Sequence, residues 1–429
     1  MNTPGRASEL IDWIHGARTL GEKKGLSNMM RMLELLGDPQ RRFSVIHVAG
    51  TNGKGSVCAC IERALRENDH VTGLFTSPYL RRYQERIRIN GEEVGDAMFE
   101  KLGARLYTVC EALAGEGILP TTFELGTALA FMCFAESGVE VAVVEVGIGG
   151  RLDPTNIVSP ICCAIASIGL DHEQILGATL PEIAREKAGI IKPNVPVALY
   201  PQELPIESII AEMASLKGAP LLLCDRLPLH VVEQTAHGAT FDAQIPEFGA
   251  IRAKIRLSGT HQIRNAHLAL CALSLAKGRG IRLDTQKVLD GLTKAHWPGR
   301  LDWRGEQLLL DGAHNEQGVR ALSDFLKQCL PGRRIVLLTA MMKEKRPKDC
   351  AAILAPLVQH VVATQVDWPR ALPARELAAL YAQSGISAEP CECIPDAFAR
   401  ATELAGKDGL VLVSGSLYLV GAIYNLIDA

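Results

Sequence analysis

The 429-residue sequence lacks several features that define common protein classes. No apolar run approaches the roughly 20 residues that a membrane-spanning helix needs. The 45 Lys and Arg residues against 48 Asp and Glu residues give a net charge of −3, so no basic excess attracts nucleic acid or an anionic membrane surface. We therefore expect neither nucleic acid nor a membrane as a partner, and any polyanion must be bound by a local group of residues.

The sequence also lacks C-x-x-C pairs, low-complexity tracts and short repeats. Its twelve cysteines are scattered, and their spacing is not that of a zinc site. The closest ones form three pairs, Cys58 with Cys60, Cys162 with Cys163, and Cys391 with Cys393. Buried free thiols are favoured over disulfides. The first residues, MNTPGRASELIDWIHGARTLG, have no basic start followed by an apolar core, so we expect a cytoplasmic protein without a secretory signal.

Short apolar runs alternate with helical patterns over most of the chain, which is typical of a parallel α/β sheet. Nine runs are strand candidates: residues 44–49, 141–146, 161–168, 195–199, 221–224, 307–310, 334–339, 360–366 and 409–414. The segment TKAHWPGRLDW separates the first five from the last four, because its Trp-Pro-Gly turn interrupts the pattern. We predict two domains, residues 1–296 and 297–429.

The stretch VIHVAGTNGKGS begins as a strand and breaks into a glycine-rich loop. It departs from the general phosphate-loop pattern G-x-x-x-x-G-K-[ST], because Val48 stands at the first glycine position and Gly55 follows Lys54. Glycines nevertheless let backbone N–H groups turn inward, Lys54 adds positive charge, and Ser56 opens a helix whose N-terminus favours anions. The pattern predicts a phosphate site, and the alternative is a tight turn with a solvated lysine.

Polar residues follow two of the predicted strands. Glu145 comes after four apolar residues, and Asp171 and His172 come after the next strand along the chain. The carboxyl edge of an open α/β sheet is where ligands bind. A carboxylate there suits magnesium on a nucleotide, and a histidine suits a metal or proton transfer. The alternatives are a carboxylate paired with a nearby cation and a structural histidine.

The segment GATLPEIAREKAGIIKP carries the signals of a helix. Thr179 can cap its start, Glu182 can close a capping box, and Gly189 can stop it. Lys187 then lies in the last turn, where the macrodipole favours a lysine whatever its role. Spacing alone therefore indicates a surface residue.

The second predicted domain adds the sequence LLLDGAHNEQG, in which a strand ends before Asp311 and His314. These side chains are candidates for facing a nucleotide, or for capping the following helix. Arg300, in the linking segment, is a candidate charge-assisted donor to a phosphate. The alternative role for Arg300 is to brace the turn.

Taken together, these stretches resemble the folylpolyglutamate synthase and dihydrofolate synthase family, relatives of the Mur peptide ligases. The resemblance covers nearly the whole chain. It rests on the ordered motifs GLSNMMRMLELLGDPQ, HVAGTNGKGS, LFTSPYL, ERIRING, TTFELGT, EVGIGGRLDPTN, GLDH, EKAGIIK, SGTHQIRNA, WPGR, DGAHN and VLVSGSLYLVG. It implies an α/β protein with an N-terminal phosphate-loop ATPase domain of the Mur ligase type, built on a mostly parallel sheet. A smaller Rossmann-like glutamate-ligase domain would follow it.

The resemblance also implies an ATP-dependent amide ligase. ATP would phosphorylate a carboxylate of dihydropteroate or of a folate, and the amine of L-glutamate would attack the acyl phosphate. A carboxylate is a poor electrophile until its oxygen becomes part of a phosphate, and magnesium and cations must offset the charge of the transferring group. Two magnesium ions are implied, and K+ is a further candidate cofactor. We expect a monomer.

Site residues are implied position by position. The ATP contacts would be Gly50, Thr51, Asn52, Gly53, Lys54, Gly55, Ser56, Asn265, Arg300, Asp311 and His314. The magnesium ligands would be Ser77, Glu145 and His172. The pterin contacts would be Gly25, Leu26, Ser27, Thr121, Thr122, Phe123, Glu124, Leu152, Asp153 and Pro154. Lys187 would be carbamylated and would position a magnesium ion, so the catalytic set would be Lys54, Glu145, His172 and Lys187.

Three positions depart from the family pattern. Ser27 stands where Glu is common, Pro154 where RLDATN has Ala, and Glu316 where AHNP has Pro. The leading expectation is a bifunctional enzyme, and the alternatives are an enzyme with one of the two activities or a Mur-type ligase acting on another carboxylate. Mur ligases usually read G-K-[ST]-[ST], so Gly55 disfavours the last. From another class, the alternative is a nucleotide-binding regulatory module without turnover.

Overall fold

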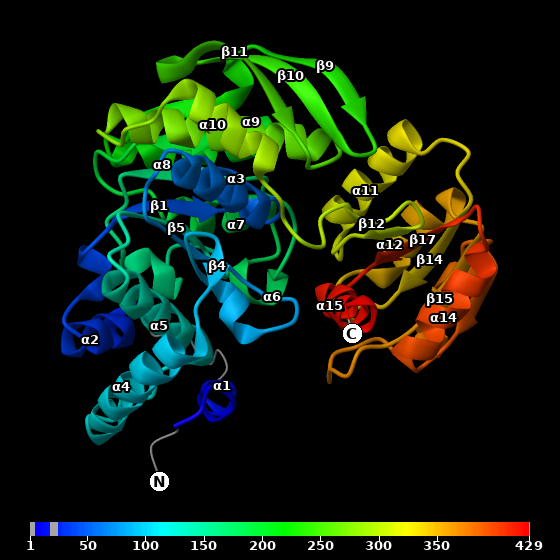
Figure 1. Ribbon diagram of the computed structural model, residues 1–429, viewed down its shortest axis with the longest axis horizontal. Helices are drawn as coiled ribbons and strands as arrows, with labels where there is room; N and C mark the ends of the chain where they lie inside the picture. The colour runs from blue at the N-terminus through cyan, green and yellow to red at the C-terminus, as the bar shows by residue number, and fades with distance from the viewer. Residues whose placement is uncertain (1–4, 18–24, 429) are drawn as a thin grey trace. The chain divides into compact units, whose positions relative to one another are not determined.

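The computed structural model describes residues 5–17 and 25–428, and the chain divides into two compact units (Figure 1). Unit 1 comprises Met1–Leu229, Ala243–Ile251 and Asn265–Ala295. Unit 2 comprises His230–Asp242, Arg252–Arg264 and His296–Ala429. Two segments that precede residue 296 thus belong to unit 2, and the single division at residue 297 stays a prediction of domain organisation.

Unit 1 is built on an eight-stranded sheet with the order β4-β3-β2-β5-β1-β6-β7-β8. The strands are β1 (Ser44–Ala49), β2 (Thr72–Phe75), β3 (Ile87–Ile89), β4 (Glu92–Glu93), β5 (Val141–Glu145), β6 (Cys162–Ile165), β7 (Val197–Leu199) and β8 (Leu221–Leu223). Pairing is parallel from β2 to β8 and antiparallel at β3 and β4. All five strands predicted here are present, because fully buried parallel strands leave near-continuous apolar runs in the sequence.

Helices cover this sheet and form two core clusters with it. They are α1 (Ala7–Gly16), α2 (Ser27–Leu35), α3 (Lys54–Glu67), α4 (Asp96–Gly115), α5 (Thr122–Glu136), α6 (Glu173–Leu176), α7 (Leu180–Ala188), α8 (Leu204–Leu216), α9 (Thr260–Gly278) and α10 (Thr285–Lys294). One cluster joins α1, α2, α4 and α5 to β1, β2 and β5, and includes Leu10, Phe75 and Phe131. The other joins α7 and α8 to β6 and β7, and includes Ile183 and Ile210.

A three-stranded sheet in the order β11-β10-β9 was not predicted. It consists of β9 (Leu229–Thr235), β10 (Gly238–Ile245) and β11 (Gly249–Ile255). In β9 most side chains are exposed, and in β11 buried and exposed side chains alternate. These strands therefore lack the continuous apolar runs that marked the others.

Unit 2 has a six-stranded sheet with the order β12-β13-β17-β14-β15-β16. The strands are β12 (Asp302–Arg304), β13 (Leu308–Leu310), β14 (Ile335–Thr339), β15 (His360–Ala363), β16 (Ala388–Pro390) and β17 (Leu410–Ser414). Only β12 pairs antiparallel. The helices are α11 (Glu316–Cys329), α12 (Pro347–Leu354), α13 (Ala374–Gln383), α14 (Ile394–Ala405) and α15 (Leu417–Ile427). The α/β class is thus confirmed, with the four strands predicted for this region.

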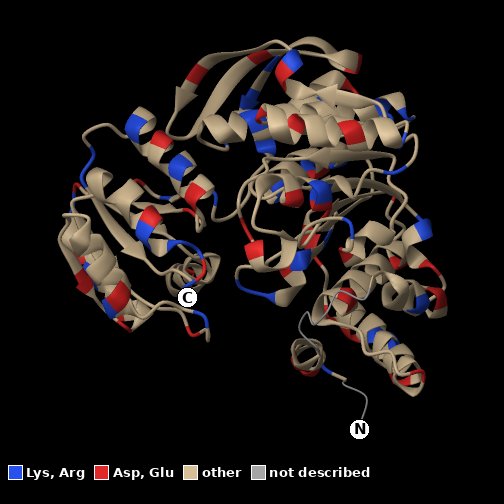
Figure 2. Ribbon diagram, turned by 180° about the vertical axis from the view of Figure 1, so that it is seen from behind, with Lys and Arg blue, Asp and Glu red and all other residues tan. Residues whose placement is uncertain are grey.

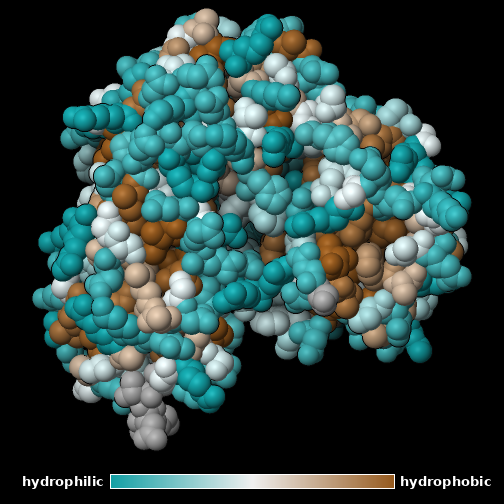
Figure 3. All heavy atoms as spheres, viewed as in Figure 1, coloured by the Kyte–Doolittle hydropathy of each residue, from teal (hydrophilic) through white to brown (hydrophobic). Residues whose placement is uncertain are grey.

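The surface carries charges of both signs. Acidic and basic residues are interspersed along the ribbons in Figure 2, and hydrophilic side chains cover much of the face in Figure 3, with hydrophobic patches between them. Within residues 5–17 and 25–428, no helix has the length and apolar character needed to cross a membrane. All twelve cysteines are free thiols, and nine are buried. Burial was wrongly predicted for Cys329 and Cys391, which are half-buried, and for Cys393, which is exposed.

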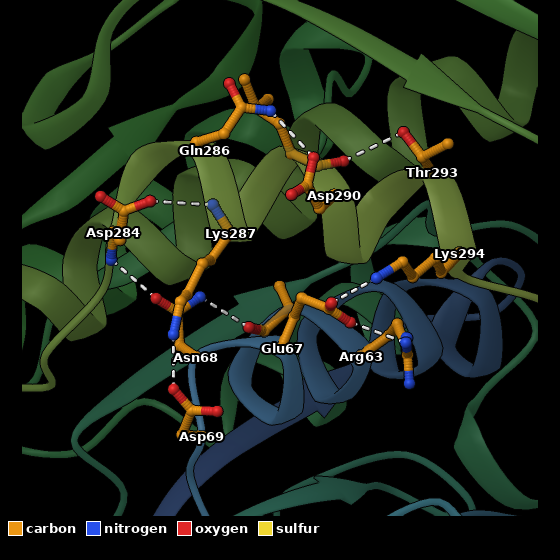
Figure 4. A network of polar contacts seen from close by, with 12 residues as sticks. Arg63, Glu67, Asn68, Asp69, Asp284, Gln286, Lys287, Asp290, Thr293 and Lys294 are labelled. Atoms are coloured by element: carbon orange, nitrogen blue, oxygen red, sulfur yellow. Dashed lines mark hydrogen bonds and ion pairs between the residues drawn. The ribbon is translucent and has the colours of Figure 1, made fainter.

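Helix α3 packs closely on α10. A Cβ atom at Gly291 would lie 2.6 Å from the Cα atom of Ala64, so the two backbones touch where α10 has no side chain. Polar contacts also link α10 and the end of α3, as Figure 4 shows. They join Arg63 to Glu67, Lys294 to Glu67, Lys287 to Asp69, and the Asp284 N–H to Asn68 Oδ1. The helix that follows the glycine-rich loop is thus held at its far end.

Gly291→Ala should destabilise unit 1 by about 1–3 kcal/mol, because the added methyl group meets backbone that cannot move aside. Chemical denaturation followed by tryptophan fluorescence measures the loss as a lower unfolding midpoint. Gly115→Ala is the matched control, since a Cβ atom there meets nothing within 4 Å. Equal midpoints for the two variants would contradict the close contact.

Candidate active site

The glycine-rich loop joins β1 to α3. Gly53 caps α3 with φ 88°, a left-handed conformation that favours glycine. The helix begins at Lys54, two residues before the predicted start at Ser56. The first N–H groups of a helix have no intrahelical acceptor, so those of Lys54, Gly55 and Ser56 form the donor-rich end that the phosphate-loop interpretation requires.

The first half of the loop is braced by the chain that follows β6. The N–H groups of Thr51 and Asn52 donate to Ser167 O at 2.7 and 3.3 Å. The hydroxyl of Thr51 lies 3.0 Å from both the O and the N of Gly169. The backbone donors of Thr51 and Asn52 are therefore used within the protein, whereas those of Lys54, Gly55 and Ser56 at the start of α3 are not used within the helix.

The second half of the loop has a hydroxyl group without an internal role. The Ser56 side chain is buried, and its Oγ has no hydrogen-bond partner in the part of the chain that the structure describes. Asn265, also buried, lies over the same turn, since a Cβ atom at Gly53 would be 2.5 Å from Asn265 Oδ1. A buried polar atom without a partner requires an explanation, and a bound anion would supply the missing partner of Ser56 Oγ. The tight-turn alternative does not explain it.

Lys54, Glu145 and Ser77 lie together. The Glu145 carboxylate, 4% exposed, accepts the Ser77 N–H at 3.1 Å, and its other oxygen lies 3.8 Å from Lys54 Nζ. Lys54 also donates to Thr51 O at 3.3 Å. The strand register explains the meeting, because Val48 pairs with Glu145. Glu145 is therefore paired with a nearby cation, as the alternative interpretation of this residue predicted. The cation is Lys54 of the glycine-rich loop.

Asp171 and His172 stand beyond β6. His172 has φ 52° and a side chain that is 41% exposed, and its N–H donates to Asp171 Oδ1 at 2.8 Å. Over residues 5–17 and 25–428, no three or more His, Cys, Asp and Glu side chains are grouped to hold a metal ion. The protein alone therefore does not supply a site with three such ligands, and a magnesium ion would also need oxygens from a nucleotide, from water or from a hydroxyl such as that of Ser77.

Lys187 is buried, which corrects the surface position that spacing alone indicated. Its side chain is 3% exposed, and Nζ donates to Gly50 O at 2.8 Å. The predicted capping box is confirmed, since Thr179 Oγ1 accepts the Glu182 N–H and Glu182 Oε2 accepts the Thr179 N–H. Helical spacing places Lys187 in the last turn, but it does not say which surface that turn packs against.

Glycines let the end of α7 approach the loop after β5. A Cβ atom at Gly150 would lie 2.7 Å from Glu186 O, and one at Gly189 would lie 2.4 Å from the Cα atom of Arg151. Gly189 ends the helix as predicted, although its φ of −60° is right-handed. The residue type is therefore required by close packing and not by a left-handed cap.

Several residues of the segments expected to contact the pterin already form hydrogen bonds or packing contacts within the protein. Thr121 and Glu124 form the capping box of α5, with the Thr121 N–H donating to Glu124 Oε2 at 2.7 Å. Phe123 packs on Gly147, where a Cβ atom would lie 2.4 Å from its ring. Thr122, Leu152 and Pro154 are half-buried. Gly25, Leu26 and Ser27 precede and begin α2, and Ser27 is exposed.

The sequence did not predict a buried network of hydrogen bonds that connects β1 to the segment after β5. Thr155 Oγ1 donates to Asp153 Oδ1 at 2.5 Å and accepts from His47 Nε2 at 2.9 Å, while Asp153 Oδ2 accepts the Ile148 N–H at 2.9 Å. Burial lowers the pKa of His47 to about 3 and raises the pKa of Asp153. The available signal was a histidine inside an otherwise apolar strand.

In unit 2, Asp311 and Arg300 lie together. Asp311 is buried and accepts the N–H groups of Leu301 and Ala313, both at 2.9 Å. Burial raises its pKa, and the charge of Arg300 opposes that shift. A Cβ atom at Gly312 would lie 2.3 Å from Arg300 Nη1. Arg300 also donates to Gly299 O at 3.1 Å, so it braces the turn as its alternative role requires.

The capping alternative for Asp311 and His314 is wrong. Asn315 caps α11, because its Oδ1 accepts the Gly318 N–H at 2.9 Å. The ring of His314 instead lies with Nδ1 2.8 Å from Gly312 O. Both residues remain at the carboxyl edge of the unit 2 sheet, where the sequence places them.

Known proteins resemble the chain in sequence and fold. The Mur ligase middle domain matches residues 92–273, and the glutamate ligase domain of Mur ligases matches residues 299–417. The dihydrofolate synthase/folylpolyglutamate synthase of Bacillus subtilis is 37% identical over 96% of each chain. The fold matches folylpolyglutamate synthase from Mycobacterium tuberculosis complexed with ADP, with a TM-score of 0.91 and 28% identity over 99% of this chain and 98% of that one. Escherichia coli FolC in complex with DHPP and ADP gives a TM-score of 0.89 and 27% identity, covering 100% and 99%.

These matches define a ligase with Mur-type domains. The chain belongs to the dihydrofolate synthase/folylpolyglutamate synthase family. It is therefore an ATP-dependent ligase that joins glutamate to folates, which confirms the resemblance seen in the motifs.

The buried His47 makes stability depend on pH. Its folded pKa of about 3 lies below the ordinary value of 6.5, so protonation favours the unfolded chain. The stabilisation is complete above pH 6.5 and is lost as the pH falls toward 3, at about 1.4 kcal/mol per pH unit. His47→Gln should reduce the slope of the urea unfolding midpoint between pH 6.5 and 4, and the remaining slope should come from His261 and His267, whose pKa values burial lowers to about 4. His230→Gln, at an exposed position, should keep the parental slope, and equal slopes for both variants would contradict the assignment.

Proposed function

We propose that the chain is bifunctional, adding L-glutamate both to dihydropteroate and to reduced folates. The observation that carries this proposal is the meeting of Lys54, Glu145, Ser77 and Lys187 around the glycine-rich loop. A cation such as Lys54 and a carboxylate able to hold a metal ion, such as Glu145, are groups that phosphoryl transfer uses to offset the charge of the transferring group. The proposal of two activities is supported by the Bacillus subtilis relative, which is named as both a dihydrofolate synthase and a folylpolyglutamate synthase and is 37% identical over 96% of this chain.

For ATP, we propose that the loop from Gly53 to Ser56 binds the phosphates. The N–H groups at the start of α3 and the buried Ser56 hydroxyl would donate to them, and Lys54 would neutralise charge. Gly50, Thr51 and Asn52 would shape the loop through their contacts with the chain after β6. The remaining nucleotide contacts would be Asn265, Arg300, Asp311 and His314.

For magnesium, the proposed ligands are Ser77, Glu145 and His172. Glu145 and Ser77 are in contact, which fits an ion bound by both. Bound magnesium would offset the negative charge on the phosphates. Carbamylation of Lys187 would give its buried end a negative charge beside Gly50 and so help to hold a second ion. K+ remains a further proposed cofactor.

The proposed reaction has two steps. A carboxylate oxygen of the pterin substrate takes the γ-phosphoryl group of ATP, which gives an acyl phosphate and ADP. The amine of L-glutamate then attacks the acyl carbon, the bond from that carbon to the phosphate oxygen breaks, and the amine loses a proton. The pterin substrate would lie along residues 25–27, 121–124 and 152–154, where Phe123, Leu152 and Pro154 offer half-buried apolar surface.

We further propose a cytoplasmic monomer. The twelve free thiols suit a reducing compartment. The regulatory-module alternative predicts loss of phosphate or metal residues, and Lys54, Ser77, Glu145, His172 and Lys187 are all present.

Purified protein with ATP, magnesium and L-glutamate should release phosphate with either dihydropteroate or tetrahydrofolate. Lys54→Ala should abolish the release, because the transferring phosphoryl group loses its cation. A coupled assay for ADP measures the rate. Activity with one substrate alone would reduce the proposal to a single synthase, and no release with either would overturn it.

Lys187→Ala should lower kcat by about 10²–10³-fold, the usual cost of losing one charge-stabilising group. Short carboxylic acids should restore part of the activity, because they supply the anion that the carbamate would provide. Lys217→Ala is the matched control, since Lys217 also stands at a helix C-terminus but is exposed. A Lys187→Ala variant with parental kcat would remove the residue from the catalytic set.

A further inference from the structure

Asn156 is a buried polar residue that connects the segment after β5 to the end of α7. It belongs to the short helical turn η3 (Pro154–Ile157) and is 5% exposed. Its Nδ2 group donates two hydrogen bonds of 3.0 Å, one to Arg151 O and one to Gly189 O. One side chain thus ties the loop after β5 to the residue that ends α7.

The bond to Gly189 O acts on the end of α7 that carries Lys187, and the bond to Arg151 O holds the Asn156 amide to the loop after β5. Lys187 lies two residues before Gly189, and its Nζ reaches Gly50 O from there. Further attachments of this end include the Arg151 N–H to Glu186 O at 2.8 Å, an Arg151–Glu186 ion pair and the packing of Ala188 and Ile190 in the core. The Arg151 side chain is 58% exposed, and exposed ion pairs contribute little. The buried amide of Asn156 therefore adds a side-chain hydrogen bond, shielded from water, to the backbone and apolar contacts of the helix end.

The other polar atoms of Asn156 also indicate that its Nδ2 donors are the important part of the side chain. Its Oδ1 is buried and has no hydrogen-bond partner in residues 5–17 and 25–428. Leaving an acceptor unsatisfied is costly, and an aliphatic side chain would fill the space without that cost. The backbone O of Asn156 accepts from Lys192 Nζ at 2.7 Å, which fixes the residue from the other side.

We propose that Asn156 is a positioning residue, which holds the end of α7 so that the Lys187 amine meets the glycine-rich loop at Gly50. It touches no substrate itself in this role. The proposal rests on the proposed function, because it assigns Asn156 an effect on the reaction only through Lys187.

Asn156→Asp tests the proposal, because the substitution keeps the shape of the side chain and removes both donors. A misplacement of Lys187 by about 1 Å should lower kcat by roughly tenfold to 10²-fold. Asn156→Ala, without the added charge, should lower it similarly and replaces the first variant if that one does not fold. Asn68→Asp is the control, since Asn68 Nδ2 also donates to a helix-end carbonyl, Ala64 O at 2.8 Å. It should keep kcat within about twofold.

Two readouts separate positioning from a general structural role. In the Lys187→Ala background, Asn156→Asp should cause no further loss of kcat, whereas additive losses would overturn the proposal. With ¹³C-labelled bicarbonate, the carbamate signal that Lys187→Ala removes should weaken in Asn156→Asp, and an undiminished signal would also overturn it. Parental kcat in Asn156→Asp would refute the positioning role while leaving the proposed function intact. An inactive parental protein would instead refute the proposed function, and the positioning role with it.

Discussion

The pairing of β1 between β5 and β6 is the constraint on which the site depends. Parallel strands bring their carboxyl ends to one edge of the sheet, and the register sets Val48 beside both Glu145 and Ala164. The glycine-rich loop after β1 therefore meets the carboxylate at the end of β5 on one side. On the other side it is braced by the chain that leaves β6, through Ser167.

Close backbone contacts also allow the end of α7 to lie near this edge of the sheet. Gly150 and Gly189 allow the last turn of α7 to lie against the loop after β5, which carries a lysine from an otherwise ordinary helix end into the interior. The buried polar residues of η3 connect the same loop to β1 through His47 and to α7 through Asn156. The glycine-rich loop, the segment after Glu145 and the helix of Lys187 are thus connected through the same buried polar residues.

The sequence predicted the nine strands that form continuous apolar runs, because burial on both faces leaves a simple signal. It did not predict β9, whose side chains are mostly exposed, or β2, which has four residues. Glu145 could be placed at a sheet edge by its position after a strand. Lys187 could not be placed by spacing, since helical periodicity does not identify the packing partner, and only the motif resemblance suggested its role. His47 and Asn156 were missed because a single buried polar residue leaves no periodic pattern.

The thiols of α3 bear on the fate of an activated acyl group. A helix N-terminus ordinarily lowers the pKa of a cysteine and makes it nucleophilic. Here burial prevails, raising the pKa of Cys58, which lies in the field of Glu145 and Lys54, and raising the pKa of Cys60 to about 12. Both sulfurs therefore stay protonated beside the phosphate loop. Cys58 and Cys60 are thus neither ionised nor exposed, so neither thiol would compete with the incoming amine for the acyl phosphate of the proposed reaction.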